Sequence, residues 1–98
     1  MKKYLVTFDL DTTEDDRSDA YSSAEEYLNG FKYHEKPMRN TYLVADEDDK
    51  IGAVKIRDSL KDLFEKDDKI IVVQMDGDWA WRNCEQSSKD ALKIILSL

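Results

Sequence analysis

The stretch KYLVTFDLD at residues 3–11 reads as a buried strand that ends in acidic residues. Aromatic and β-branched side chains favour extended backbone, so we expect a strand from Lys3 to Leu10. Asp9 stands where this strand ends. An Asp at such a place commonly bonds to nearby backbone amides. The residues alone therefore predict that Asp9 caps the loop that follows.

A helix is expected after the polar segment 11–16. Thr13 with Asp16 three residues later resembles a capping box. Apolar side chains then recur at helical spacing on one face, at Ala20, Ala24, Tyr27 and Leu28. We expect the helix to end at Asn29-Gly30, because both residue types tolerate left-handed backbone.

A hairpin and a second helix follow. Residues 31–35 alternate weakly, Lys36-Pro37 predicts a turn, and Thr41–Ala45 predicts the returning strand. The acidic segment 46–49 suits a loop before a helix start. The second helix is expected from Ile51 to Glu65, on the spacing of Ile56, Leu60, Leu63 and Phe64.

The last part of the chain predicts a strand and a short helix. Residues 69–75 are apolar except Lys69 and Gln74, as in a strand at the centre of a sheet. A turn at 76–78 and the segment WAWRNC at 79–84 come next. Ser87 and Asp90 resemble another helix cap. The final amphipathic helix is predicted by Ala91, Leu92, Ile95 and Leu96.

The order strand, helix, strand, strand, helix, strand is that of an α+β, ferredoxin-like split βαβ fold with a short C-terminal helix. We expect one domain over residues 1–98, with its core at 3–76 and a C-terminal extension at 77–98. Chain-crossing rules suggest that the first and last strands lie side by side in the middle of the sheet, with both core helices on one face.

The opposite face of this sheet is expected to be apolar too. Ile71 and Val73 alternate with Ile70 and Val72, so either set is apolar. An exposed apolar face usually marks an interface. Two arrangements would cover it: a homodimer that packs sheet on sheet, or the C-terminal helix folded back over its own sheet. The two are compatible.

Composition limits the classes of function. Charged residues make up 38% of the 98 residues, and the formal net charge is −7. This acidity disfavours nucleic acid as a partner, although a basic patch, a divalent metal or a basic protein would reconcile the two. One Cys and one His exclude a Cys/His zinc site within one chain. The N-terminus predicts no signal peptide or membrane span, so we expect a cytoplasmic protein.

Six short motifs together resemble a known family. They are TFDL at 7–10, YH at 33–34, TYLV at 41–44, IRDSL at 56–60, DDKIIVV at 67–73 and AW at 80–81. In this order and spacing, over residues 3 to about 82, the chain resembles the SinR-like relatives of the small CRISPR-associated protein of the spacer-integration complex. That family is ferredoxin-like and homodimeric. VapD-type toxins are a more distant resemblance.

The resemblance implies a second role for Asp9. In the spacer-integration family, the acid at the end of the first strand lies at the dimer axis, where it and its twin are candidates to hold a divalent metal for cleavage of RNA or DNA. Asp9 occupies that position here. Mg²⁺ or Mn²⁺ would suit a pair of carboxylates. Both interpretations of Asp9, structural cap and metal ligand, stay open.

Other candidate contact residues form two groups. Around the hairpin lies the basic group Lys32, His34, Lys36 and Arg39, which suits phosphate contact or a plain solvated turn. After the last core strand come Trp79, Trp81 and Arg82. Two Trp side chains two residues apart share one face of an extended segment, where they stack on bases or, more commonly, cover a core or a dimer contact. Cys84 has no neighbouring base and is interpreted as structural.

Three functions follow as hypotheses. The first is a noncatalytic dimeric adaptor that binds another, unidentified protein, as the resemblance to defence-related bacterial or phage proteins implies. The second is a metal-dependent endonuclease with paired Asp9 residues. The third is an acidic decoy that mimics nucleic acid for a basic protein, which rests on the net charge of −7 alone.

Overall fold

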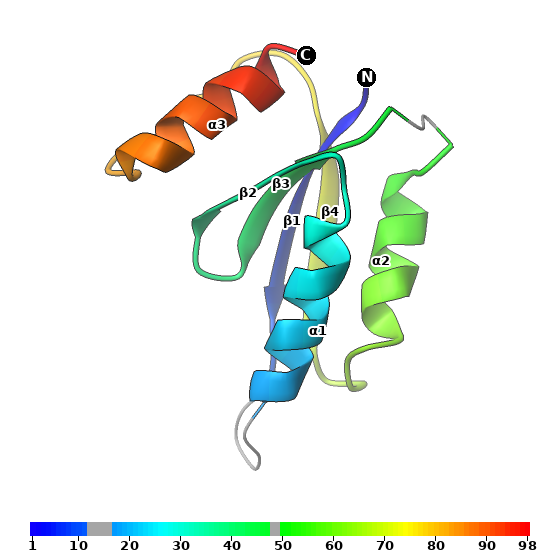
Figure 1. Cartoon of the computed structure of the whole chain (residues 1–98). Helices are drawn as coiled ribbons and strands as arrows, with labels where there is room; N and C mark the ends of the chain where they lie inside the picture. The colour runs from blue at the N-terminus through cyan, green and yellow to red at the C-terminus, as the bar shows by residue number, and fades with distance from the viewer. Residues whose placement is uncertain (12–16, 48–49) are drawn as a thin grey trace.

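The computed structural model describes residues 1–11, 17–47 and 50–98, and it shows a four-stranded antiparallel sheet with helices on both faces (Figure 1). The strands are β1 (Lys3–Asp9), β2 (Tyr33–Met38), β3 (Thr41–Ala45) and β4 (Lys69–Met75). The helices are α1 (Ser18–Asn29), α2 (Ala53–Lys61) and α3 (Gln86–Leu96). This order confirms the predicted α+β, ferredoxin-like arrangement with a C-terminal helix.

The strand order in the sheet is β2-β3-β1-β4. β1 and β4 are neighbours, as predicted, with Val6 opposite Val72. The prediction that both lie in the middle is wrong, because β3 pairs with the other side of β1 and leaves β4 at the edge. The apolar run of β4 therefore does not reflect a central position. Its side chains Ile71 and Val73 are 59% and 48% exposed.

The first face of the sheet carries the main core. Side chains of β1 alternate in burial, and Tyr4, Val6 and Phe8 are buried against the two helices α1 and α2. These helices contribute the buried residues Ala24, Leu28, Ile56 and Leu60. The Phe8 ring lies 5.3 Å from Phe64 and 6.1 Å from Tyr21, measured between ring centroids. The helical faces predicted from spacing are thus buried, except at Leu63, which lies beyond the end of α2 and is 40% exposed.

The ends of α1 and α2 differ from the predictions. α1 ends before Gly30, but Gly30 has φ −74°, so a left-handed residue does not end this helix. α2 is shorter than predicted, since it stops at Lys61 and a tighter turn follows, in which the amide of Leu63 donates to Leu60. The proposed cap of Thr13 and Asp16 lies outside the described residues.

The turn of the β2–β3 hairpin lies later than predicted. Pro37 belongs to β2, and Asn40 has φ 58° in the tight turn between the strands. The register shifts between Glu35 and Met38, so an irregularity accommodates Pro37. Proline is tolerated there because β2 is an edge strand and need not donate a hydrogen bond at that position.

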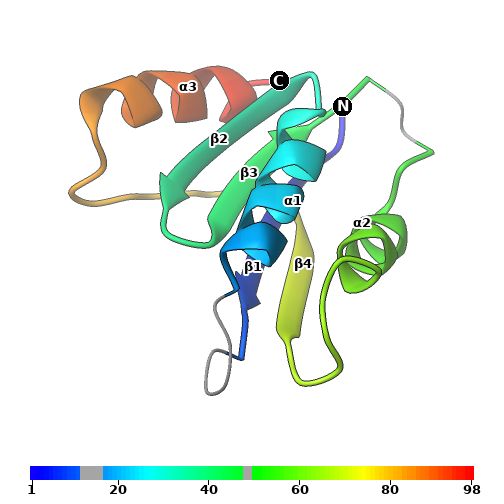
Figure 2. The same ribbon diagram turned by 60° about the horizontal axis from the view of Figure 1, so that its bottom comes forward.

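α3 folds back over the second face of the sheet, as one of the two predicted arrangements has it (Figure 2). Leu92 and Ile95 pack against Leu43 and Ala45 of β3 in a second buried cluster. The predicted cap is wrong: α3 begins at Gln86, and no side chain caps its N-terminus. The Ser88 hydroxyl instead donates to the Glu35 carboxylate at 2.7 Å.

Candidate functional site

The second face of the sheet is divided into a covered half and an open half. α3 lies over β2 and β3, where Leu43 and Ala45 are almost fully buried. The half formed by β1 and β4 has no helix over it, and there Ile71 and Val73 are exposed. Leu5 of β1 stands in register with Val73. The open half is therefore an apolar strip at the edge of the sheet.

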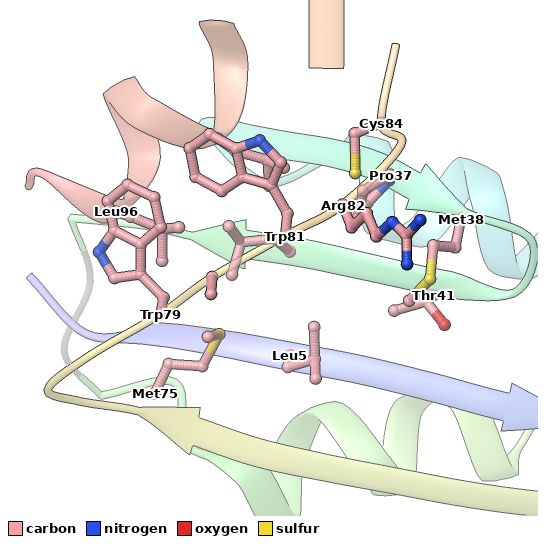
Figure 3. A pocket seen from close by; sticks show the side chains of 13 residues that line it. Leu5, Pro37, Met38, Thr41, Met75, Trp79, Trp81, Arg82, Cys84 and Leu96 are labelled. Carbon is pink, nitrogen blue, oxygen red and sulfur yellow. The ribbon is translucent and has the colours of Figure 1, made fainter. Parts of the chain in front are cut away.

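A pocket of about 280 Å³ lies between the two halves (Figure 3). The segment after β4 crosses the second face on its way to α3, and its side chains form one wall. The sheet and α3 form the others. The lining residues are Leu5, Pro37, Met38, Thr41, Leu43, Met75, Trp79, Ala80, Trp81, Arg82, Cys84, Leu92 and Leu96.

Trp79 and Trp81 are stacked in this wall. Their ring centroids lie 4.7 Å apart and the ring planes differ by 9°. This agrees with the prediction that they share one face of an extended segment. Trp81 is partly buried and Trp79 is 39% exposed. The two stacked rings thus form an aromatic part of the pocket wall, although their use as a base-stacking surface stays a prediction.

Arg82 is the one charged residue among those that line the pocket. Its guanidinium lies near Met38 and Thr41 in Figure 3. It forms no ion pair with any carboxylate of residues 1–11, 17–47 and 50–98. The Thr41 hydroxyl is 3.2 Å from that of Thr7 on β1. One end of the pocket therefore carries a cation and a hydroxyl, and the remaining walls are apolar.

Cys84 lies in the same pocket. Its thiol is partly buried and forms no disulfide. The side chain belongs to the second apolar cluster, beside Leu92. This placement agrees with the interpretation of Cys84 as structural.

Asp9 is exposed at the end of β1, opposite Lys69 in the register with β4. By strand alternation it belongs to the second face, with Leu5 and Thr7. Within the described part of the chain, no three His, Cys, Asp or Glu residues are grouped so as to hold a metal ion. A single exposed carboxylate is a poor site for Mg²⁺ or Mn²⁺. One copy of the described residues therefore does not form the metal site that the resemblance implies.

Close to the end of β1 lies an ion pair that the sequence analysis missed. Both terminal nitrogens of Arg17 donate to Asp68, at 2.8 and 2.5 Å, and one also donates to the Asp11 carbonyl. Asp68 accepts two backbone N–H groups as well, from Asp11 and Glu65. The Arg17 hydrogen bonds hold the pKa of the Asp68 carboxyl well below its usual range. The only signal in the sequence is the conspicuous DD pair at 67–68 before β4.

The basic group of the hairpin is dispersed, and none of its four residues lines the pocket. Lys32 pairs with the Glu47 carboxylate, so its charge is compensated. Lys36 lies over the Tyr42 ring, 5.6 Å from its centroid, and Tyr42 belongs to the core of the first face. The His34 ring nitrogen Nδ1 is 3.0 Å from the Phe31 carbonyl. Arg39 is exposed in the hairpin turn. These four residues are not brought together with Trp79, Trp81 and Arg82.

Comparison with models of known protein families finds no match, and comparison with curated proteins finds none either. Among the described residues, none of the helices has the length and apolar character needed to cross a membrane. The candidate site must therefore be interpreted from its own geometry. Two features carry it, the open apolar strip of β1 and β4 and the adjoining pocket.

Proposed function

We propose that this protein is a noncatalytic interaction module that acts as a homodimer, with the open half of the second face as its self-association surface. The observation that carries the proposal is the exposure of Ile71 and Val73 on the edge strand β4. Proteins usually protect an edge strand with charges, proline or a covering element. On its second face, the middle of β4 carries no charged residue and no proline, and no helix of the described residues covers it.

A second copy of the chain is the partner that this strip suits best. The strip is apolar and can therefore pack against itself across a two-fold axis, as the shared surface of a symmetric dimer does. Elsewhere the surface of a chain with net charge −7 repels another copy. This combination restricts self-association to the strip. The dimer then presents its acidic outer surface to a further protein, which is the adaptor role that the family resemblance implies.

The proposal is tested by the mass of the protein in solution. Light scattering after size-exclusion chromatography is expected to give twice the chain mass of 11.4 kDa. Val73→Lys places a charge in the strip and is expected to give the mass of one chain. The matched control is Val54→Lys on α2, where the side chain is 63% exposed on a different surface; it should stay dimeric. A wild-type chain that is monomeric at high concentration would contradict the proposal.

A metal-dependent endonuclease is the second candidate, and one observation favours it. Asp9 belongs to the same face as the strip, so a dimer formed there brings the two Asp9 carboxylates toward a common interface. A site shared by two copies would supply a second carboxylate to the metal ion, which a single copy does not. We test it with labelled RNA and DNA in the presence of Mg²⁺ or Mn²⁺. Cleavage that needs metal and is lost in a dimeric Asp9→Ala variant would establish the enzyme; no cleavage by the wild-type dimer agrees with the adaptor.

A further inference from the structure

The pocket beside the strip has the chemistry of a small-molecule site. It is enclosed on several sides by elements distant in sequence: Leu5 of β1, Leu43 of β3, Leu92 of α3 and the stacked Trp79 and Trp81. Binding sites for small ligands are typically apolar clefts with a few polar groups that fix orientation. At about 280 Å³ it lies near the lower end of the usual volumes, roughly 300–1,000 Å³.

We propose that this pocket binds a small apolar monocarboxylate, with the ring or branched body of the ligand against Trp79 and Trp81 and its carboxylate at Arg82. The proposal goes beyond self-association and does not depend on it. It rests on the pairing of apolar walls with the exposed Arg82 at one end, which forms no ion pair with the carboxylates of the described residues.

The apolar walls select the body of the ligand. The two stacked indole rings form an aromatic wall, against which compact apolar groups pack with favourable dispersion and ring contacts. Leu92 and Leu96 of α3 also line the pocket, and Leu96 lies beside Trp79 (Figure 3). A volume of about 280 Å³ admits one small organic molecule.

The polar end of the pocket, at Arg82, favours a negatively charged group on the ligand. A guanidinium pairs with a planar carboxylate through two parallel hydrogen bonds, which is its preferred geometry. Within the described residues Arg82 has no carboxylate partner, in a chain where acidic residues outnumber basic ones by 22 to 15. The Thr41 hydroxyl can donate a further bond to the ligand when it accepts one from Thr7.

Tryptophan fluorescence tests the proposal directly, because the chain has two Trp residues and both line the pocket. The probe is 4-phenylbutyrate, and its neutral amide, 4-phenylbutyramide, is the matched ligand. We expect a saturable change in emission with the acid and an affinity about tenfold lower for the amide, as the loss of one charge-assisted contact implies. Equal binding of both, or binding of neither, would overturn the proposal.

Two variants assign the site. Arg82→Gln is expected to lower the affinity for the acid about tenfold and to leave the affinity for the amide unchanged. Arg57→Gln removes the same charge from α2, where Arg57 bonds to Asp58, and should bind the acid as the wild type does. If both variants bind the acid equally weakly, the loss reflects the net charge of the protein, and the assignment of the site to Arg82 is wrong.

A third measurement separates this site from the dimer surface. Val73 does not line the pocket, so the Val73→Lys variant should still bind 4-phenylbutyrate. Bound acid should also slow the alkylation of Cys84, the single cysteine of the chain, by N-ethylmaleimide. Unprotected Cys84 at saturating acid would place the probe elsewhere and overturn the proposal, whatever the oligomeric state.

Discussion

The Asp68 carboxylate joins two segments that are far apart in the sequence, residues 11–17 and 65–68. It accepts two hydrogen bonds from Arg17 and one each from the backbone amides of Asp11 and Glu65. The carboxylate is fully buried and the Arg17 side chain is nearly so. Burial of a charge is costly unless all its hydrogen bonds are made. This residue therefore determines how the end of β1 is fixed next to the start of β4.

Replacing Asp68 with Asn is expected to destabilise the fold. The amide oxygen accepts only part of the four hydrogen bonds, and its NH₂ group would face the Arg17 guanidinium, which has no acceptor. The matched control is Asp67→Asn, an exposed neighbour whose replacement should change the free energy of unfolding by no more than about 0.5 kcal/mol. Urea unfolding followed by circular dichroism measures both. Equal midpoints for the two variants would contradict the role of Asp68.

Stability should also depend on pH through Asp68. Its pKa is lower in the folded state than the ordinary Asp value of about 3.9. A carboxyl with a lowered pKa stabilises the fold fully above the unfolded value, and this contribution is lost as the pH falls toward the folded value. We expect the urea concentration at the unfolding midpoint to decrease when the pH is lowered below about 4. This decrease should be smaller in Asp68→Asn than in the wild type. If the midpoints of the wild type and of Asp68→Asn decrease equally with pH, other carboxyl groups cause the loss of stability.

Sequence reasoning found part of the candidate site and missed the buried Arg17–Asp68 ion pair, for a physical reason. Trp79 and Trp81 lie two residues apart, so period-two alternation was enough to place their rings together. Arg17 and Asp68 are separated by 51 residues, and only the tertiary structure brings them within hydrogen-bond distance. No local period marks such a pair. The resemblance directed attention to Asp9, whereas the buried carboxylate is Asp68, the neighbour of the residue that pairs with Asp9 in the sheet.

At the scale of elements, α3 is attached to the sheet at both ends. Near its start, Ser88 donates to Glu35 of β2. Near its end, the Lys3 ammonium donates to the Leu96 carbonyl at 2.9 Å, where a cation also interacts favourably with the helix C-terminus. Between these contacts Leu92 and Ile95 are buried. The helix is therefore part of the fold, and one wall of the pocket depends on it.

Removal of the Leu92 side chain should detach α3 from the sheet. We expect Leu92→Ala to lower the free energy of unfolding by about 2–5 kcal/mol, the usual range for a buried leucine. Ile94→Ala is the matched control on the same helix, since Ile94 is 60% exposed. Trp emission should shift to longer wavelength in Leu92→Ala only, because the pocket opens. A loss of stability as large in Ile94→Ala would show that helix propensity, not packing, accounts for the effect.

The positions of strands and helices were predictable where the apolar residues of a segment follow a single spacing, that of a strand or that of a helix. β3 and β4 have the predicted bounds, and the buried faces of all three helices follow from their 3.6-residue spacing. Pro37 misled the prediction because proline serves both in turns and in edge strands. The place of β4 was misjudged because an edge strand that is apolar on both faces has the same sequence pattern as a central strand.

At the scale of the whole molecule, charge and the apolar strip act in opposite directions on self-association. Each copy carries a net charge of −7, so two copies repel one another at a distance. The extents of the molecule are 40 × 33 × 21 Å. The Debye length is about 30 Å at 0.01 M salt and about 10 Å at 0.1 M. Repulsion between whole copies is thus strong at low salt and largely screened near physiological ionic strength, while contact between apolar side chains persists.

Added salt should therefore strengthen the dimer. Between about 0.01 and 0.1 M NaCl we expect the dissociation constant to fall roughly two- to fivefold, measured by sedimentation equilibrium. The Val73→Lys variant, whose strip is interrupted by a charge, should remain monomeric at both concentrations. An acidic decoy behaves in the opposite way, because its binding to a basic protein rests on attraction that salt weakens. A dimer that dissociates as salt rises would mean that ion pairs, and not Ile71 and Val73, hold the two copies together.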